Sequence, residues 1–260
     1  MPRYLGSGTL VRYRVVIPAR YGSTRLPGKP LIDIAGKPMI VRVAEQALRS
    51  RATGVVVATD DGRVVEALRG SGAEATLTRD DHRSGSDRVM EVVDAKGWPD
   101  DEVVVNVQGD EPLIPPVVID HVAGLIDDEC EVATLGEPIT APGDVFDPNI
   151  VKVVADRRGR ALYFSRAPIP WHRDTFGRTP PQIGTAWRRH IGIYAYRAGA
   201  LRAFVSYPPS RLEEIEALEQ LRLMDHGHAI AVAEAAAPVP GGVDTPADVD
   251  RVLDVLRGVG

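Results

Sequence analysis

A loop dense in positive charge follows the first apolar run of the chain. Arg20, Arg25 and Lys29 lie within ten residues of one another, directly after the β-branched segment at positions 15–17. Guanidinium and ammonium groups bind phosphate oxygens, and Gly22 and Gly28 would let the main chain approach an anion closely. We therefore predict a polyphosphate site in this loop. The competing interpretation is an exposed loop whose charges are solvated, but three like charges this close repel one another unless an anion joins them.

The common phosphate-binding motifs do not describe this loop. A P-loop has four residues between its glycines and a Ser or Thr after its lysine, whereas five residues separate Gly22 from Gly28 and Pro30 follows Lys29. The glycine fingerprint of dinucleotide-binding proteins is also absent after this segment. The sequence thus argues against a Walker-type NTPase and against a nicotinamide-dependent enzyme.

Two aspartates are candidate metal ligands. Asp110 lies in the polar stretch Asn106–Pro112 after an apolar segment, and Asp244 ends a Gly-Gly-Val-Asp stretch after the last predicted strand. Mg²⁺ takes one or two carboxylates together with phosphate oxygens and water, so this pair suits a magnesium–nucleotide site. Aspartate is also frequent in turns and helix caps, which is the alternative for both residues.

A polar loop at positions 81–88 precedes a predicted helix. Its Ser84, Gly85 and Ser86 would place free backbone N–H groups near a base carbonyl or a phosphate. Ordinary helix capping explains the same residues, so this loop by itself favours neither interpretation.

The elements that position these loops alternate in the first half of the chain. Apolar runs predict strands at 15–17, 55–58, 74–78 and 102–107, and amphipathic segments predict helices at 39–50, 63–68 and 87–95. Short connections between them are typical of βαβ units, whose ligands gather at the carboxyl ends of parallel strands. We expect Arg20, Asp60, Ser84 and Asp110 to lie at that edge.

The second half is richer in strands. We predict strands at 132–135, 189–196 and 230–233, and a hairpin formed by 151–155 and 161–164. A proline-rich loop spans 167–186, and we interpret it as mobile or covered by a partner, which leaves open whether it closes over a substrate. A capping box at Ser210 predicts a single helix over 212–225, with Leu212, Ile215, Leu218 and Leu221 in the core. Thr245 and Pro246 begin a final helix.

Composition narrows the classes of protein. The chain has 260 residues, 44% of them hydrophobic, and a net charge of −5 without a basic run, which disfavours nucleic acid as a partner. Cys130 is the only cysteine, so an intramolecular disulfide or a thiolate metal cluster is excluded and a reducing cytoplasm is expected. Residues 1–14 contain no apolar stretch typical of a signal peptide or membrane span, and we interpret them as a flexible tail.

Five segments together resemble the family of 3-deoxy-D-manno-octulosonate (Kdo) cytidylyltransferases, which are CTP-dependent sugar-acid nucleotidyltransferases. The segments are Pro18–Pro30, Asn106–Pro112, Tyr163–Arg166, His190–Tyr194 and Gly242–Pro246. The resemblance implies an α/β Rossmann-like fold with a mixed, mainly parallel sheet flanked by helices, and a smaller β-rich region for acceptor binding and dimerisation. It implies one domain over 15–260, with a nucleotide part at about 15–130, an acceptor part at about 131–230 and a return to the core at 231–260.

The resemblance also implies roles for individual residues. The family transfers CMP from CTP to the anomeric hydroxyl of Kdo with magnesium and acts as a homodimer. Arg20, Lys29 and Asp110 would be catalytic, and Asp110 and Asp244 would hold Mg²⁺. The nucleotide would be bound by Ala19, Arg20, Ser23, Arg25, Lys29, Ser84, Gly85, Ser86, Arg88 and Gln108. The sugar acid would be bound by Gln108, Arg166, Arg173, His190, Tyr194, Glu219 and Gln220.

Two departures from the family pattern bear on the acceptor. Ser86-Asp87 stands where Thr-Glu is expected, and His172 replaces an expected acidic residue. Two alternatives therefore stand beside CMP-Kdo formation: the same transfer to another small acid, such as a different ulosonic acid or a phosphonate, and a nucleotide-binding protein without catalytic activity.

Overall fold

The computed structural model describes residues 11–22, 26–174, 176 and 186–258. Ser23 and Arg25 of the cationic loop, the first ten residues of the predicted tail and half of the 167–186 loop lie outside the described residues.

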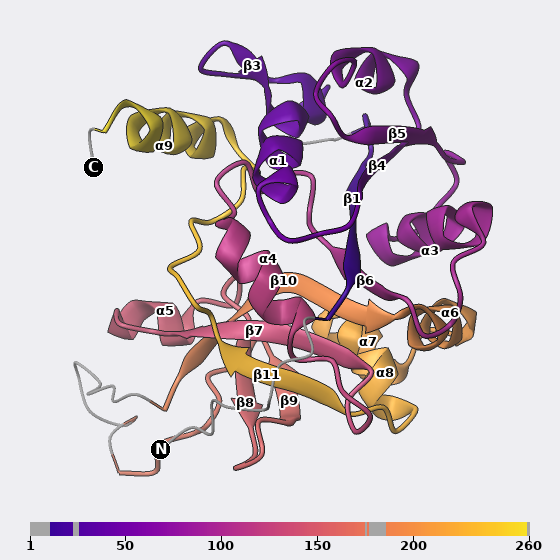
Figure 1. Ribbon diagram of the computed structural model, residues 1–260. Helices are drawn as coiled ribbons and strands as arrows, with labels where there is room; N and C mark the ends of the chain where they lie inside the picture. Colours follow the sequence, from indigo (N-terminus) through magenta and orange to yellow (C-terminus); the bar gives the residue numbers. More distant parts are fainter. Residues whose placement is uncertain (1–10, 23–25, 175, 177–185, 259–260) are drawn as a thin grey trace.

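One large mixed sheet joins both halves of the chain (Figure 1). Its main path runs β11–β7–β10–β6–β1–β4–β5, and β8 and β9 extend it from β10. The strands of the first half pair in parallel, whereas β10 runs antiparallel to β6, β7 and β8. The strand bounds are β1 Tyr13–Ala19, β4 Val55–Thr59, β5 Glu74–Leu77, β6 Val103–Asn106, β7 Val132–Pro138, β8 Lys152–Ala155, β9 Ala161–Ser165, β10 Arg188–Arg197 and β11 Ile230–Glu234.

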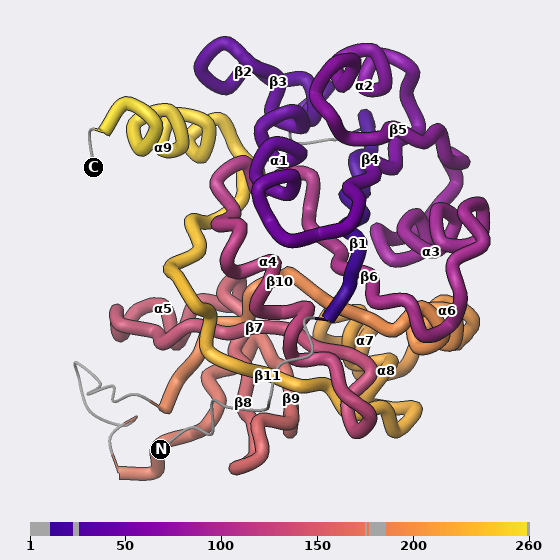
Figure 2. Tube along the Cα trace, viewed as in Figure 1, coloured from indigo at the N-terminus to yellow at the C-terminus, as the bar shows by residue number. Residues whose placement is uncertain are grey.

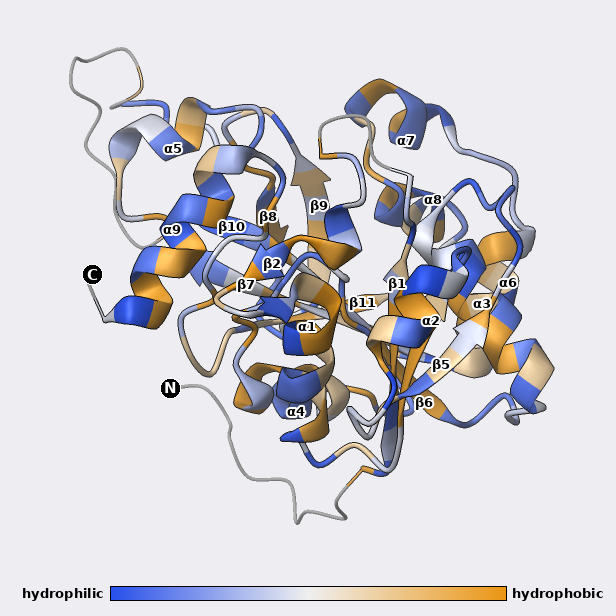
Figure 3. Cartoon of the chain, turned by 90° about the horizontal axis from the view of Figure 1, so that it is seen from above, coloured by the Kyte–Doolittle hydropathy of each residue, from blue (hydrophilic) through white to orange (hydrophobic). Residues whose placement is uncertain are grey.

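Helices cover both faces of this sheet. On one face α1 and α4 pack against the apolar residues Val15, Ile17 and Val105, and on the other α3, α6 and α8 pack against Val16 and Val104. Figure 3 shows that the helices carry both hydrophobic and hydrophilic faces, as expected where one side meets a sheet and the other meets water. The bounds are α1 Met39–Leu48, α2 Gly62–Ala67, α3 Gly85–Lys96, α4 Pro116–Ala123, α5 Pro142–Phe146, α6 Ala198–Ser206, α7 Arg211–Glu216, α8 Gln220–Asp225 and α9 Pro246–Arg257.

A small satellite cluster holds the C-terminal helix beside the loop that follows β1. Met39, Val243 and Val252 are fully buried there, next to the two-stranded ribbon β2 Asp33–Ile34 and β3 Lys37–Pro38 (Figure 2). A short 3₁₀ helix, η1 Lys29–Leu31, precedes the ribbon. This cluster holds the segment before α9 close to the loop that follows β1.

The predicted strands and the hairpin of β8 and β9 are confirmed, as is the helix that begins after Thr245. The single helix over 212–225 is wrong: the chain breaks at Ala217, which has a φ of 49°, and two short helices result. Leu212 and Ile215 are consequently 41% and 69% exposed, whereas Leu218 and Leu221 are buried as predicted. The helices α4, α5 and α6 were not predicted.

Candidate active site

A cavity of about 370 Å³ opens at the carboxyl ends of β1 and β6, beside the start of α3. It is lined by Pro18, Ala19, Arg20, Gly22, Lys29, Pro30, His82, Arg83, Ser84, Gly85, Arg88, Gln108, Gly109, Asp110 and Asp244. Every nucleotide-site residue expected from the sequence and described in the structure lines this cavity, except Ser86. The structure thus assembles the cationic loop, the polar loop before α3 and both aspartates around one space.

Close backbone packing sets the floor of the cavity. A Cβ atom at Gly109 would lie 2.7 Å from the carbonyl oxygen of Pro18, so only glycine fits between the ends of β1 and β6. Gly28 has a φ of 68°, and this left-handed turn starts η1 and directs Lys29 back toward the sheet. Gly28 thus shapes the cationic loop and Gly109 the cavity floor, whereas the close approach of an anion to Gly22 and Gly28 stays a prediction.

Lys29 holds the two aspartates together. Its Nζ donates to Oδ2 of Asp110 at 2.6 Å and to Oδ1 of Asp244 at 2.9 Å. Burial alone would lower the pKa of Lys29, but its ion pairs and hydrogen bonds with the two carboxylates outweigh burial and raise the pKa. Lys29 is therefore charged at neutral pH.

The two carboxylates fit a divalent cation. Both reach a single ammonium group, so both can reach one metal ion in the same region, and carboxylate oxygens are the donors that Mg²⁺ prefers. The described residues contain no group of three or more His, Cys, Asp and Glu side chains that could enclose a metal. A cation here would need further ligands, and phosphate oxygens and water supply them in nucleotide sites.

The loop before α9 fixes the second aspartate. Val243 N donates to the carbonyl oxygen of Asp110 at 2.9 Å, which ties this loop to the end of β6. Asp244 N donates to Oδ2 of Asp248, whose carboxylate also completes the capping box of Thr245. Residues more than 130 positions apart in the sequence are held side by side by these main-chain contacts.

The N-terminus of α3 forms another wall. Ser84 is the N-cap, and its hydroxyl accepts from Asp87 N while the Asp87 carboxylate accepts from Ser84 N. The capping interpretation of this loop is thus confirmed. In this capped first turn, the N–H groups of Gly85 and Ser86 have no acceptor within the helix. Such groups favour an anion or a carbonyl oxygen as their partner.

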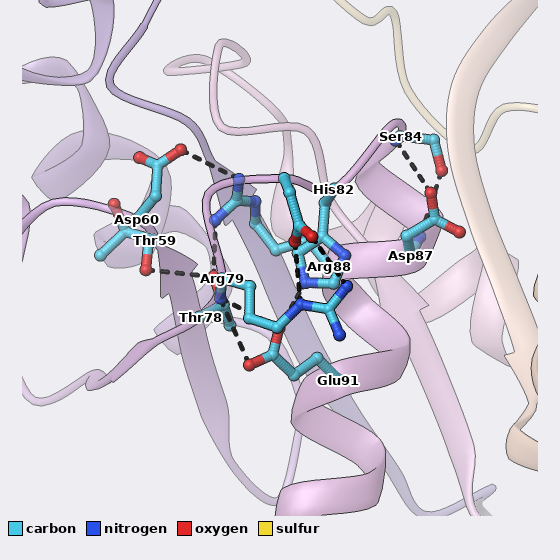
Figure 4. Close-up of polar contacts among 10 residues, drawn as sticks. Thr59, Asp60, Thr78, Arg79, His82, Ser84, Asp87, Arg88 and Glu91 are labelled. Carbon is cyan, nitrogen blue, oxygen red and sulfur yellow. Dashed lines mark hydrogen bonds and ion pairs between the residues drawn. The ribbon is translucent and has the colours of Figure 1, made fainter.

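Asp60 connects this helix to the cationic loop, and Figure 4 shows its contact with Arg88. Its Oδ1 accepts from Tyr21 N at 2.9 Å, and its Oδ2 accepts from Nη2 of Arg88 at 3.0 Å. The other guanidinium nitrogen of Arg88 donates to Thr78. The side chains of Arg88 and Asp60 are only 3% and 10% exposed, so this is a nearly buried ion pair between two walls of the cavity.

The predicted acceptor residues Tyr194, Glu219 and Gln220 lie on the face of the sheet covered by α3. Tyr194 is directly opposite Asn106 in the β6–β10 ladder, so their side chains share this face. Among the described residues, three buried polar atoms here lack a hydrogen-bond partner: Asn106 Oδ1, Tyr194 OH and Gln220 Nε2. Buried polar groups are nearly always paired, so unpaired ones suggest a missing ligand or water.

Glu219 links this face to the nucleotide cavity. Ser86 Oγ donates to Oε2 of Glu219 at 3.2 Å, and burial raises the pKa of the Glu219 carboxyl. The hydroxyl of Ser86 therefore faces Glu219, which explains why Ser86 does not line the cavity.

The other predicted acceptor residues are used differently in this structure. Arg166 donates to the carbonyl oxygens of Pro148, Glu216 and Ala217. His190 contacts Thr134 Oγ1 at 3.1 Å and packs on Phe164 and Tyr194, and burial lowers its pKa to about 3. Arg173 is exposed. None of the three lines the 370 Å³ cavity, and their binding of an acid stays a prediction.

The sequence analysis expected Asp60 at this edge but gave it no role, and it gave none to Asn106, His82 and Glu111. Asp60 follows β4 and Asn106 ends β6, the two strands that flank β1, and that position is the signal that marks them. His82 lines the cavity and hydrogen-bonds to Glu91. Glu111 follows Asp110 in the chain. Burial of the Glu111 carboxyl, reinforced by the negative charge of Asp110, raises the pKa of Glu111 to about 8.

An α/β sheet with a cationic loop after its central strand, a helix N-terminus beside it and two carboxylates at its edge is the arrangement of a nucleotidyltransferase. Fixed positive charge on the cavity wall can neutralise phosphate oxygens, and a volume of about 370 Å³ is in the range of small-molecule sites.

The comparisons with known proteins define the family. The chain belongs to the cytidylyltransferase family, whose profile matches residues 14–230. It is 54% identical over 244 residues to the 3-deoxy-manno-octulosonate cytidylyltransferase of Serratia proteamaculans, covering 94% of this chain and 98% of the relative. It is 55% identical over 242 residues to the enzyme of the same name from Yersinia pseudotuberculosis, covering 93% and 97%.

A solved structure shares the fold of this chain over nearly its whole length. The structure of CMP:2-keto-3-deoxy-manno-octonic acid synthetase complexed with CTP is 45% identical to this chain, with a TM-score of 0.85, covering 95% of this chain and 99% of the other. The Rossmann-like nucleotidyltransferase fold expected from the sequence is thus confirmed. Among the described residues, no helix has both the length and the apolarity required to span a bilayer.

Proposed function

We propose that this protein transfers CMP from CTP to the anomeric hydroxyl of Kdo and releases pyrophosphate. The observation that carries the proposal is full-length similarity at 54–55% identity to enzymes named for this reaction, combined with a cavity lined by the matching loops. The hydroxyl oxygen of the acid forms a bond to the α-phosphorus as the bond to the β-phosphate oxygen breaks. The hydroxyl proton leaves to solvent, and no covalent enzyme intermediate is required.

The cationic loop would bind and neutralise the triphosphate. Arg20 and Lys29 line the cavity, and charge that builds up on the leaving pyrophosphate is best stabilised by fixed cations. The first-turn N–H groups of α3 and the side chain of Gln108 offer donors and an acceptor for the base. Alignment and charge neutralisation supply the rate in this mechanism.

The magnesium ion expected for this reaction would be held by Asp110 and Asp244. When bound, it neutralises phosphate oxygens and orients them for in-line attack. The carboxylates that now share the ammonium of Lys29 would be its protein ligands.

The acceptor would bind beside Ser86, over the face that carries Tyr194, Glu219 and Gln220. A polyol carboxylate needs several hydrogen-bonding groups, and the unpaired Tyr194 OH and Gln220 Nε2 supply an unused donor pair. Arg166, His190 and Arg173 would contribute after a rearrangement of their present contacts.

Further properties follow from the family resemblance. We propose a cytoplasmic homodimer that supplies activated Kdo for lipopolysaccharide biosynthesis. Leu162 of β9 and Ile215 of α7, 60% and 69% exposed, are candidate dimer contacts, because the Ser165–Glu216 hydrogen bond ties these two elements together. Sedimentation equilibrium of the wild type and a Leu162→Glu variant tests this part.

Pyrophosphate release measured with CTP, Mg²⁺ and a panel of acids tests the reaction. The panel contains Kdo, N-acetylneuraminate and small phosphonates, and we expect release with Kdo. Release with a different acid alone would keep the CTP half of the proposal and replace the acceptor. Tight CTP binding with no release for any acid would instead establish a binding protein.

A further inference from the structure

One ammonium group occupies the place where the two carboxylates converge. Lys29 Nζ lies 2.6 Å from Asp110 and 2.9 Å from Asp244. The lysine side chain is 14% exposed, whereas those of Asp110 and Asp244 are 32% and 49% exposed. The lysine is therefore the inner member of the trio, and the carboxylates lie between it and solvent.

Three separate parts of the fold impose this arrangement. The left-handed turn at Gly28 and the 3₁₀ helix η1 fix the main chain of Lys29. Asp110 follows β6, and its carbonyl oxygen accepts from Val243 N, so the loop that bears Asp244 is held at the same place. The contact is thus fixed by the backbone: the turn at Gly28 places Lys29, and the main-chain hydrogen bond between Val243 and Asp110 holds the two aspartates together.

The carboxylate oxygens of Asp110 and Asp244 cannot bind the Lys29 ammonium and a divalent metal ion equally well at the same time. A divalent ion bound by both carboxylates would lie within a few ångströms of Nζ, where repulsion between the two positive charges is strong and little screened by solvent. The lysine would have to move before the metal binds well. A triphosphate in the cavity offers the ammonium another anionic partner close by.

We propose that Lys29 is an internal counter-cation that keeps the two carboxylates from binding a divalent ion until a nucleoside triphosphate takes over its charge. The metal ion and the nucleotide then bind together. In the nucleotide-free enzyme neither carboxylate is available to a metal ion. The inference rests on the proposed function for the identity of the nucleotide and the metal, but it concerns the nucleotide-free protein.

Binding of Mn²⁺ alone, measured by electron paramagnetic resonance without nucleotide or acid, tests the proposal. We expect weak binding to the wild type and at least tenfold tighter binding to Lys29→Met, which keeps the length of the stem and removes the charge. Lys37→Met is the matched control, because Lys37 stands in the second Gly-Lys-Pro sequence and pairs with Glu45 away from the cavity. Its affinity for Mn²⁺ should equal that of the wild type.

The first outcome that would overturn the inference is a property of the wild type, so it does not depend on the folding of a Lys29 variant. Tight Mn²⁺ binding to the nucleotide-free wild type at Asp110 and Asp244, identified by its loss in Asp244→Asn, would contradict it. Equal Mn²⁺ affinity of Lys29→Met and the wild type, with the variant folded by circular dichroism, would contradict it as well. Neither measurement uses turnover, so failure of the proposed reaction with Kdo would be seen separately in the pyrophosphate assay.

Discussion

Asp110 and Asp60 each follow a strand of the parallel sheet, but their carboxylates have different partners. Asp110 shares the ammonium of Lys29 at the mouth of the cavity, whereas Asp60 is nearly buried against Arg88 and a main-chain N–H. The first is placed to meet a ligand, and the second to hold the walls of the site in position.

The substitution Asp110→Asn should remove turnover and leave the fold intact. It deletes one of the two charges that would bind magnesium, and we expect the rate of pyrophosphate release to fall by roughly 100-fold or more. Asp250→Asn on the exposed surface of α9 is the control and should retain full activity. An Asp110→Asn enzyme with wild-type activity would show that the metal ligands are elsewhere.

The substitution Asp60→Asn should weaken CTP binding selectively. It keeps an oxygen for Tyr21 N but removes the charge opposite Arg88, so the cationic loop and α3 lose their common anchor. We expect KM for CTP to rise on the order of tenfold while KM for the acid changes little. Glu102→Gln, which breaks the partly buried pair with Arg14 at the far end of the sheet, is the control. Equal changes in both KM values would mean that Asp60 acts only on stability.

At the scale of elements, the break between α7 and α8 positions the acceptor side. Ala217 adopts a left-handed conformation there, and Arg166 donates to the carbonyl oxygens of Glu216 and Ala217. The buried Lys152 in turn donates to the carbonyl oxygen of Arg166 at 2.7 Å. Glu219 is the N-cap of α8 just after this break, and its carboxylate accepts from Ser86 Oγ.

The substitution Ala217→Gly should stabilise the protein. A left-handed residue with a Cβ costs about 1–2 kcal/mol, and glycine avoids that cost at the expense of a more flexible unfolded chain. We expect a net gain of up to about 1 kcal/mol in the free energy of unfolding in urea. Ala203→Gly inside α6 is the opposite control and should lose about 1 kcal/mol. A loss at position 217 would indicate that the methyl group makes contacts worth more than the strain.

At the scale of the whole molecule, the sheet order brings together residues that are far apart in the chain. β6 and β4 flank β1, so the loops after all three strands meet at one edge, and the contact of α9 with the ribbon near η1 returns Asp244 to the same place (Figure 1). The antiparallel strand β10 adds the acceptor face next to β6.

The contribution of His190 to the stability of the fold should decrease as the pH falls below about 6.5. His190 has a pKa of about 3 in the folded protein against an ordinary value of 6.5, so the unfolded chain binds the proton first. Its contribution is complete above pH 6.5 and is lost progressively as the pH falls toward 3. Between pH 6.5 and pH 5 we expect a loss on the order of 1–2 kcal/mol from this group.

Urea unfolding of the wild type and His190→Gln across this pH range checks the contribution of His190. The variant should lose stability less steeply as the pH falls, whereas His226→Gln, at an exposed histidine, should follow the wild type. Parallel curves for His190→Gln and the wild type would contradict the assignment.

The sequence by itself determined the α/β class, most strands and the residues of the nucleotide cavity. These features depend on local patterns: apolar runs form strands, and in a parallel sheet the loops that follow them meet at one edge, so Arg20, Ser84 and Asp110 could be grouped before any coordinates were known. The helix that starts after Thr245 follows from a capping box, which is also local.

Only the tertiary structure decided which polar groups are already paired. The helix over 212–225 breaks at Ala217, whose carbonyl oxygen accepts from Arg166, some fifty residues earlier, and no pattern within the segment contains that contact. Likewise, the ion pairs of Lys29 with Asp110 and Asp244 depend on three backbone segments that meet only in the folded chain. Hydrogen bonds and ion pairs form between neighbours in space, and for these residues the neighbours are distant in sequence.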